Sequence, residues 1–179
     1  MFPPLLLASL FAPLLASALY LRHGQNFLTP GRMGSIVADE LLPSTPLEGV
    51  RIHPNFNNRK CVTVRGGVKA EGTPVIIFDC NGSASQNWII NDADTKVQWA
   101  GTNWCLTGGR SPGNNVRARI TKCTDGAVGQ DWYYTADLRV NLAGRGQCLD
   151  LINGNLDNSN GVQTYECNPF DTNQIWNTS

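Results

Sequence analysis

The sequence predicts an all-β protein, built as a closed barrel from three copies of a unit of about 43 residues. The six cysteines are separated by 19, 25, 18, 25 and 19 residues, so short and long gaps alternate. Three Gln-x-Trp triplets, beginning at Gln86, Gln130 and Gln174, recur every 44 residues. A repeat of this length constrains the architecture before any single element is assigned.

Each copy contains short apolar segments between turns rich in Gly, Asn and Pro. The clearest are "VIIFDC", "VRARITKC" and "VQTYEC", and no window of 12 residues keeps a helical stripe. These segments predict β-strands. The period would also suit a propeller blade, but three blades are fewer than usual and the WD-type signatures are missing. A barrel with pseudo-threefold symmetry is favoured, because closure removes exposed sheet edges.

Composition excludes one large class of partner. The chain has 179 residues, of which 14 are basic and 14 acidic, and no Lys or Arg cluster. Such a surface has little with which to neutralise a phosphate backbone, so we expect no nucleic-acid partner. Once a targeting segment is removed, the length suits one domain of ordinary size.

The first 18 residues, "MFPPLLLASLFAPLLASA", predict a signal peptide. The stretch is apolar and ends on Ala16, Ser17 and Ala18, the small-x-small pattern that signal peptidase accepts. It lacks a Lys or Arg ahead of its apolar core, so a membrane anchor is the alternative. Three prolines and an apolar core shorter than the roughly 20 residues of a spanning helix disfavour an anchor. We therefore expect a secreted, extracellular protein with no membrane insertion after cleavage.

The repeats follow a segment of different character. Residues 19–46 have no sustained period and contain three prolines, which predicts a linker or pro-segment, and the repeated domain occupies residues 47–179. The cysteines all lie in that domain: Cys61, Cys80, Cys105, Cys123, Cys148 and Cys167. An even number in a secreted chain indicates disulfides. We expect no metal and no cofactor, since no Cys-x-x-Cys exists and the histidines, His23 and His53, lie outside the cysteine framework.

The Gln-x-Trp series in phase with the cysteine pairs, together with "CLDL…GVQTYECN…NQIW", resembles the ricin B-type lectin domain. This domain is a β-trefoil and is also classed as a family 13 carbohydrate-binding module; the likeness covers about three quarters of the chain and extends to small secreted fungal lectins. Six cysteines permit 15 pairings, and the repeat favours one disulfide within each copy: Cys61–Cys80, Cys105–Cys123 and Cys148–Cys167. The resemblance also implies that the repeated Gln-x-Trp residues serve the core: Gln86, Trp88, Gln130, Trp132, Gln174 and Trp176. A large indole that needs a partner for its N–H suits such a position.

Only the third copy combines an aspartate with an aromatic residue at the family's sugar-binding positions. Aligned on the first cysteine, the copies read "CVT", "CLT" and "CLD", so Asp150 stands where the others have threonine. Two residues before the second cysteine stand Phe78, Thr121 and Tyr165. A carboxylate accepts hydrogen bonds from two adjacent sugar hydroxyls, and an aromatic ring covers the apolar face of the sugar. The resemblance gives these roles to Asp150 and Tyr165.

Amide side chains complete the expected carbohydrate-binding set: Asn153, Asn168, Asn173 and Gln174. Gln174 is ambiguous, because the copies without the aspartate also have glutamine there, and a structural role that steadies Asp150 is favoured. Taken alone, Asp150 also fits a turn or surface acid, and Tyr165 fits a half-buried strand residue.

The other copies depart from the pattern, so we expect one competent site. The first has Thr63, and its Asn81-Gly82-Ser83 is a glycosylation sequon; the second has threonine at both positions. A second sequon begins at Asn177. The resemblance implies a galactose-type or xylose-type glycan as partner, and we expect a monomer that binds without agglutinating.

Catalysis and protein binding are the two alternative functions. Catalysis is not expected, because no pair of acids can be placed across a scissile bond and the repeats have no histidine in their cores. A protein-binding module such as a protease inhibitor is the alternative, with the loops Gly108–Asn115, which carries Arg110, and Asn153–Gly161 as candidates. The alternating Asn153, Asn155 and Asp157 hint at calcium, but Thr164 stands where a glutamate would be needed, so a polar turn is favoured.

Overall fold

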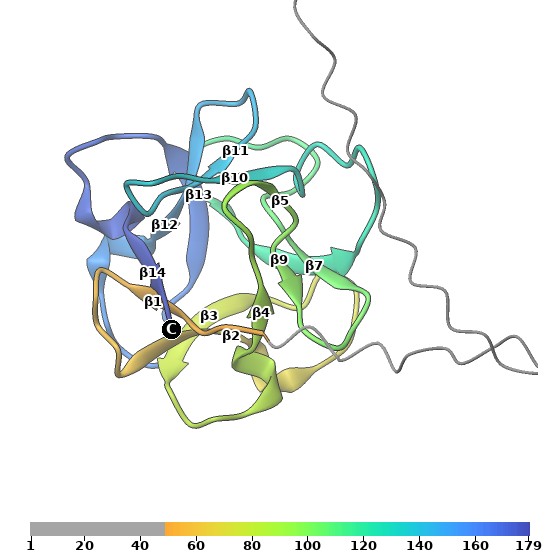
Figure 1. The fold of residues 1–179 in the computed structure, drawn as a ribbon, viewed down its shortest axis with the longest axis vertical. Helices are drawn as coiled ribbons and strands as arrows, with labels where there is room; N and C mark the ends of the chain where they lie inside the picture. The colour runs from red at the N-terminus through yellow and green to blue at the C-terminus, as the bar shows by residue number, and fades with distance from the viewer. Residues whose placement is uncertain (1–48) are drawn as a thin grey trace, which may run out of the picture. The chain divides into compact units, whose positions relative to one another are not determined.

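A computed structural model describes residues 49–179, which form a three-lobed all-β barrel (Figure 1). The expected signal peptide, residues 1–18, and the expected linker, residues 19–46, lie outside the described residues. Within residues 49–179 the helices are single 3₁₀ turns, and none of them has the length or the apolar character needed to cross a bilayer.

Each repeat fills four strand positions, set by its two cysteines and its Gln-x-Trp triplet. The strand before the first cysteine is β1 (Ile52–Pro54), then β5 (Ala93–Thr95) with β6 (Gln98–Trp99), then β11 (Val140–Leu142). The strand with the first cysteine is β2 (Lys60–Val64), β7 (Trp104–Thr107) or β12 (Gln147–Leu151). The strand before the second cysteine is β3 (Val75–Asp79), β8 (Val116–Arg117) with β9 (Arg119–Lys122), or β13 (Val162–Glu166). The repeated tryptophan opens β4 (Trp88–Ile89), β10 (Trp132–Tyr134) and β14 (Trp176–Thr178).

The same strand pairing occurs in all three repeats, and the first and last strands then pair to close the barrel. The hairpins β2–β3, β7–β9 and β12–β13 are antiparallel and share one register about their cysteines. β1 pairs with β14, so that Pro54 lies opposite Trp176. The first described strand therefore meets the last, as Figure 1 shows beside the C-terminus. The expected β-trefoil with three pseudo-symmetric repeats is confirmed.

The three expected disulfides are confirmed, and each joins the two strands of one hairpin: Cys61–Cys80, Cys105–Cys123 and Cys148–Cys167. They close short loops with sequence separations of 19, 18 and 19 residues. Closing a loop of that length with a disulfide stabilises the folded state by about 3 kcal/mol, because the bond lowers the conformational entropy of the unfolded chain.

The repeated tryptophans lie at the centre of the core. Trp88, Trp132 and Trp176 are 0–1% exposed. Each indole N–H donates to the carbonyl of the residue after the first cysteine of its own repeat: Val62, Leu106 and Leu149, at 2.9, 3.0 and 2.9 Å. A buried indole thus keeps its one donor satisfied.

Between its two cysteines, each repeat has a long loop that packs on the next repeat. The loop after β7 contacts β13, where Glu166 donates its backbone N–H to Asn114 Oδ1 at 2.7 Å. The loop after β12 contacts β3 in the same way, through Asp79 and Asn158 at 2.9 Å. The surface above each hairpin is therefore shaped by the repeat before it.

Candidate functional site

The expected aspartate lies in the middle of the β12–β13 hairpin. Asp150 is opposite Gln163, and Cys148 is opposite Tyr165. Opposite residues of an antiparallel pair share a face, as do residues two apart on one strand, so Asp150, Gln163 and Tyr165 face the same way. Diagonal neighbours of this kind lie about 7–8 Å apart, within reach of an aromatic side chain. The register thus brings the carboxylate and the ring together.

The Asp150 carboxylate is 4% exposed and is held by two amides. Its Oδ1 accepts from Gln163 Nε2 at 2.9 Å, and its Oδ2 accepts from Gln174 Nε2 at 3.5 Å. Burial is the main cause that raises the pKa of Asp150 above 3.8; the charge of Asp171 also raises this pKa, and the two amides lower it. A carboxylate oxygen has two lone pairs, so each retains capacity for a further donor.

Gln163 is a site residue that the sequence reasoning missed. Its side chain is nearly buried and makes the shorter of the two amide bonds to Asp150. A signal was available in the repeats, since the corresponding residues, four before the second cysteine, are Ile76 and Arg119. The third copy alone has an amide there.

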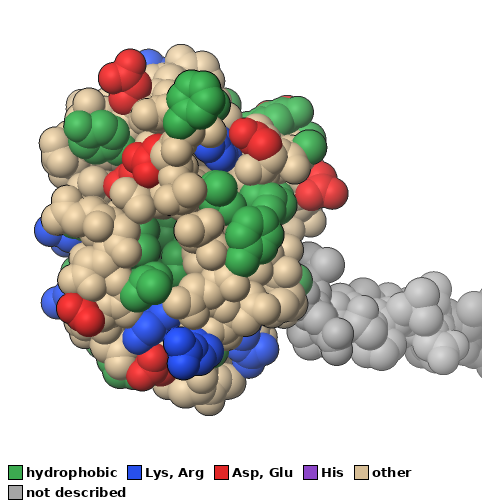
Figure 2. All heavy atoms as spheres, turned by 90° about the vertical axis from the view of Figure 1, so that its left-hand side faces the viewer, with side chains coloured by type: hydrophobic (Ala, Val, Ile, Leu, Met, Phe, Trp, Pro, Cys, Tyr) green, Lys and Arg blue, Asp and Glu red, His purple; other side chains and the backbone are tan. Residues whose placement is uncertain are grey.

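Tyr165 borders a shallow hollow formed with the turn that follows β13. The residue is 36% exposed, and the hollow, of ≈ 300 Å³, is also lined by Asn168, Pro169 and Asp171. Figure 2 shows the face that lies on the left of Figure 1, where hydrophobic side chains reach the surface in several places separated by polar ones. Phe170, in the same turn, is 90% exposed and was also missed from the sequence. Strand β13 and the turn after it thus each present one aromatic ring to solvent.

Gln174 makes the contacts that every copy makes. In each repeat, the glutamine Oε1 accepts the N–H of the residue after the second cysteine at 2.9 Å. Its Nε2 donates to the carbonyl of the residue before that cysteine, at 2.9, 2.8 and 2.9 Å. Only in the third repeat does the Nε2 also face a carboxylate, that of Asp150. Gln174 therefore belongs to the scaffold and positions the aspartate.

The expected asparagines are placed less uniformly. Asn153 is in η3 (Ile152–Gly154) with a left-handed φ of 54°, and Asn173 is in η4 (Thr172–Gln174). The two turns touch, because a Cβ added to Gly154 would lie 2.5 Å from Asn173 Oδ1. Asn168 Oδ1 accepts the N–H of Phe170 at 3.0 Å. Within residues 49–179, none of the three hydrogen-bonds to Asp150.

The first repeat has a neutral hydroxyl, not a carboxylate, at the equivalent point. The Thr63 hydroxyl donates to the Cys61 carbonyl at 2.8 Å and accepts from Gln86 Nε2 at 3.2 Å. Asn158, from the third-repeat loop, spans the end of this hairpin and accepts from Lys60 Nζ at 2.8 Å. The hairpin is thus internally satisfied and partly bridged.

The second repeat is closed more directly. Thr107 Oγ1 accepts the Gly109 N–H at 3.0 Å, and a Cβ added to Gly129 would lie 2.7 Å from that oxygen. Thr121, at the aromatic position, accepts from Gln130 Nε2 at 2.6 Å. Backbone fills the space above Thr107, and this hairpin has neither a carboxylate nor an aromatic ring at the two key positions.

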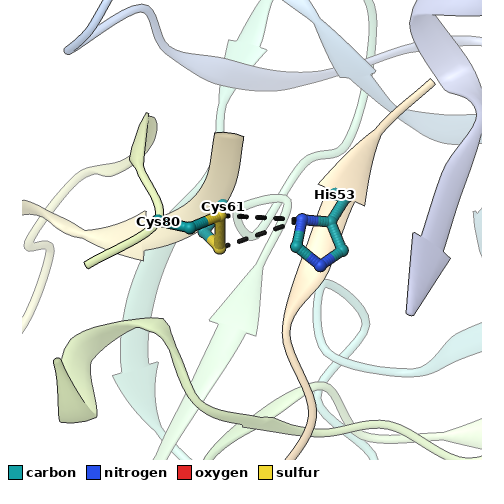
Figure 3. Close-up of side chains that lie close together, drawn as sticks. All are labelled: His53, Cys61 and Cys80. Carbon is teal, nitrogen blue, oxygen red and sulfur yellow. Dashed lines mark hydrogen bonds between the residues drawn. A yellow bond between two sulfur atoms is a disulfide. The ribbon is translucent and has the colours of Figure 1, made fainter. Parts of the chain in front are cut away.

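One His and Cys cluster in the described part of the chain resembles a metal site. Figure 3 shows His53 against the first disulfide, with its Nδ1 3.8 Å from Cys61 Sγ and 3.7 Å from Cys80 Sγ. In the sequence His53 precedes the cysteine framework, but in space it packs on it. Nδ1 lies 2.8 Å from the Lys60 carbonyl, to which it donates, and both sulfurs are in the disulfide. Neither sulfur is a thiolate ligand, and we assign no metal to this cluster.

The loop considered for protein binding is anchored to the barrel. The Gly113 carbonyl accepts a hydrogen bond from the Thr164 hydroxyl at 2.7 Å, while Arg110, near the start of the loop, is exposed.

The two glycosylation sequons differ in how free their asparagine side chains are. Asn81 is exposed in a turn, whereas the Asn177 side chain bonds the Phe56 N–H at 2.8 Å and Asn58 Oδ1 at 3.1 Å.

Comparison with known families gives one match. The model of the ricin-type beta-trefoil lectin domain matches residues 48–176. No curated protein sequence matches the chain.

Solved structures agree at the level of the fold. The C-half of the earthworm R-type lectin, solved with GalNAc, has a TM-score of 0.60 at 12% identity, covering 74% of this chain and 98% of that one. The Rhizoctonia solani agglutinin has a TM-score of 0.60 at 22% identity, covering 75% and 96%. The designed threefold-symmetric protein ThreeFoil has a TM-score of 0.59 at 18% identity, covering 72% and 96%. Part of the GalNAc-T7 chain, 22% of its length, also matches 75% of this chain, with a TM-score of 0.54 at 23% identity.

Proposed function

This chain belongs to the ricin-type β-trefoil lectin family, a family of carbohydrate-binding domains, and we propose that it is a secreted lectin with one sugar site, in the third repeat. The proposed ligand is a galactose-type or xylose-type ring. The observation that carries the proposal is the shared face of Asp150, Gln163 and Tyr165 on the β12–β13 hairpin. Among the three hairpins, only this one has a carboxylate beside an exposed aromatic ring.

The chemistry of the hairpin suits a sugar ring. Two adjacent hydroxyls would donate to Asp150, whose low exposure makes each bond stronger than it would be in open water. Gln163 keeps the carboxylate oriented and leaves an amide oxygen that accepts a further hydroxyl. The Tyr165 ring would cover the C–H face of the sugar, with little conformational entropy to lose.

Binding without catalysis is the proposed role. Asp171 is the acid whose charge raises the pKa of Asp150, but its Oδ1 accepts the Asn173 N–H at 2.9 Å and caps η4. A capping carboxylate is committed to the backbone and is poorly placed as an acid or base for a glycosidic bond.

A single site also sets the expected strength. A water-exposed monosaccharide site binds with a Kd of about 1 mM to 1 μM, which is roughly −4 to −8 kcal/mol. Avidity requires at least two sites engaged together. We therefore propose a monomer that binds glycans and does not agglutinate cells.

The test compares Asp150→Asn with a matched aspartate elsewhere. Asp125, in the second repeat, is fully exposed, so Asp125→Asn removes the same charge away from the site. Wild type and both variants would be tested on a glycan array, and then by calorimetry with galactose, xylose and their oligomers. We expect Asp150→Asn to weaken binding roughly 10- to 100-fold, as for the loss of a hydrogen bond to a charged group, and Asp125→Asn to have no effect.

Two outcomes would contradict the proposal. Equal binding by wild type and a folded Asp150→Asn would place any sugar site elsewhere. Absence of glycan binding combined with protease inhibition that is lost in Arg110→Ala would favour the protein-binding alternative, through the loop Gly108–Asn115.

A further inference from the structure

A second hollow, at the pseudo-threefold axis, has a different chemistry. The strands that precede the second cysteines meet there, since Val75 donates its N–H to the Ala118 carbonyl at 3.0 Å and Ala118 donates to Val162 at 2.9 Å. The side chains of these three residues are buried in the core. Their strand neighbours therefore point the other way, outward around the axis. These outward-pointing neighbours border a hollow of ≈ 340 Å³, which is lined by residues of all three repeats.

Three arginines line this axial hollow: Arg65, Arg117 and Arg119. The lining contains no Asp or Glu, and none of the three arginines takes part in a salt bridge within residues 49–179. Arg119 gives one N–H to the Gly72 carbonyl at 2.9 Å. A guanidinium has five N–H donors, so most of the donors in the hollow have no protein acceptor. Three exposed like charges around one hollow repel one another, and an anion between them would relieve the repulsion.

The third repeat makes room for one of these arginines. A Cβ added to Gly161 would collide with Arg117 Nη1 and would lie 3.1 Å from Ile152 Cδ1. Gly161 does not have a left-handed φ, so space rather than backbone conformation explains the glycine. The glycine lets the Arg117 guanidinium lie along the wall of the hollow.

The size of the hollow indicates more than a lone ion. Its volume lies at the lower end of the about 300–1,000 Å³ typical of small-molecule sites. Guanidinium groups bind carboxylate, sulfate and phosphate oxygens in pairs of parallel hydrogen bonds. Asn160 and Ser159 add polar groups to the wall.

We propose that the axial hollow binds an acidic sugar unit, whose sulfate or carboxylate group is held by Arg117 and Arg119. The choice of a sugar as the carrier of the anion rests on the carbohydrate-binding family, but the site does not depend on Asp150. In the sheet register, Arg117 is opposite Gln163 and Gln163 is opposite Asp150. Two strand spacings, about 10 Å, therefore separate the two backbones, and the sites are neighbours with separate residues.

The experiment measures binding of four probes by calorimetry: a heparin-derived sulfated disaccharide, digalacturonic acid, neutral lactose and sodium sulfate. Wild type is compared with the double variant Arg117→Gln/Arg119→Gln. The control is Arg145→Gln, which removes an exposed charge outside the hollow. Arg65→Gln provides a milder second variant should the double variant fold poorly.

We expect wild type to bind at least one of the two acidic disaccharides more tightly than sodium sulfate. The double variant should lose roughly 10- to 100-fold in affinity for that disaccharide, and Arg145→Gln should lose little. Binding of the sulfated probe alone would identify sulfate as the group recognised, and binding of digalacturonic acid alone would identify carboxylate. In labelled wild type, the amide signals of Ala118 and Gly161 should shift with the same probe.

The axial proposal fails if wild type binds neither acidic disaccharide better than sodium sulfate. It also fails if Arg145→Gln loses as much affinity as the double variant, because binding would then be a general charge effect. Asp150→Asn separates the two sites: we expect it to keep the acidic binding. Loss of neutral-sugar binding in Asp150→Asn leaves the axial proposal standing, and loss of acidic binding there overturns it.

Discussion

The first and third repeats share the contacts that hold the scaffold together and differ in a few side chains. Both have a disulfide across the hairpin, a buried tryptophan bonded to its own repeat and a glutamine that ties the second cysteine's neighbours together. At two opposite positions in the middle of the hairpin, the first repeat has Thr63 and Ile76 where the third has Asp150 and Gln163. The scaffold is therefore independent of the site, which makes it possible for one copy to keep the site while another lacks it.

The neighbouring loop adds a second difference. Both hairpins receive an asparagine from the preceding repeat at the same backbone position, Asn158 on the first and Asn114 on the third. Asn158 also bonds the side chains of Lys60 and Asp79, whereas a single side-chain bond joins Asn114 to β13. Asn158 thus makes more side-chain bonds to the first hairpin than Asn114 makes to the third.

The largest expected effect tests whether the scaffold is equivalent in all copies. Trp88→Ala, Trp132→Ala and Trp176→Ala should each lower the free energy of unfolding by about 3–5 kcal/mol, because each removes a buried indole and leaves a cavity. Urea unfolding measures the loss, and Trp→Phe variants replace any that do not fold. A much smaller loss in one repeat would show that the core is not threefold.

The next effect concerns pH and separates Asp150 from an ordinary acid. Its pKa is raised above 3.8, mainly by burial, so the carboxylate takes up a proton at a higher pH than an exposed aspartate does. Sugar binding through the charged form should therefore be complete near neutral pH and fall as pH drops through the raised pKa. Calorimetric titrations from about pH 7 to about pH 3 measure it, with circular dichroism confirming that the protein stays folded. Binding that is unchanged over this range would rule out the carboxylate as the acceptor.

A smaller effect tests the aromatic half of the site. Tyr165→Ala should weaken sugar binding by about 0.5–1.5 kcal/mol, roughly 2- to 12-fold, because a ring contact is lost. Tyr165→Phe keeps the ring and should bind almost as wild type does. Phe78→Ala, at the same position of the first repeat, is the control and should leave the affinity unchanged. Equal losses in Tyr165→Phe and Tyr165→Ala would show that the hydroxyl matters rather than the ring.

The asparagine ties should differ in strength. Asn158→Ala removes bonds to Lys60 and Asp79 and should lower the free energy of unfolding by about 0.5–1.5 kcal/mol. Asn114→Ala removes one side-chain bond and should cost less. Thermal unfolding of both variants measures the difference. Equal costs would mean that the extra side-chain bonds of Asn158 contribute nothing in this exposed position.

The smallest expected effect has the opposite sign. Because the folded state raises the pKa of Asp150, stability falls as pH rises from 3.8 through that raised pKa, and the charged carboxylate costs stability at neutral pH. Asp150→Asn should therefore raise the unfolding temperature slightly while it weakens binding. A lower unfolding temperature would mean that the bonds from Gln163 and Gln174 outweigh the cost of burying the charge.

The fold could be predicted from the periodic features of the sequence. The spacing of Cys61, Cys105 and Cys148 and the recurring Gln-x-Trp predicted three equivalent units, since a repeated residue must serve a repeated contact. The pairing of the cysteines was inferred from the repeat, because six cysteines by themselves permit 15 pairings. Asp150 and Tyr165 were found because they break the repeat, and features that break a repeat are visible when the copies are aligned.

Gln163 shows what the alignment of copies did not reveal by itself. It is four residues before a cysteine and looked like an ordinary strand residue, until the register placed it opposite Asp150. Asn153 and Asn173, expected in the carbohydrate-binding set, lie in two touching turns and make no hydrogen bond to Asp150 within residues 49–179. Side-chain direction depends on register and on left-handed residues such as Asn153, which linear spacing does not specify.

The sequence by itself determined the repeat, the all-β class and the uniqueness of the third copy, because these depend on residue identity at a fixed period. Only the tertiary structure decided which loop covers which hairpin, that Gln163 holds Asp150, and that arginines distant in sequence, Arg65 and Arg117, border one hollow. Those features arise where three repeats meet, and contacts between repeats depend on how the barrel closes rather than on any local pattern.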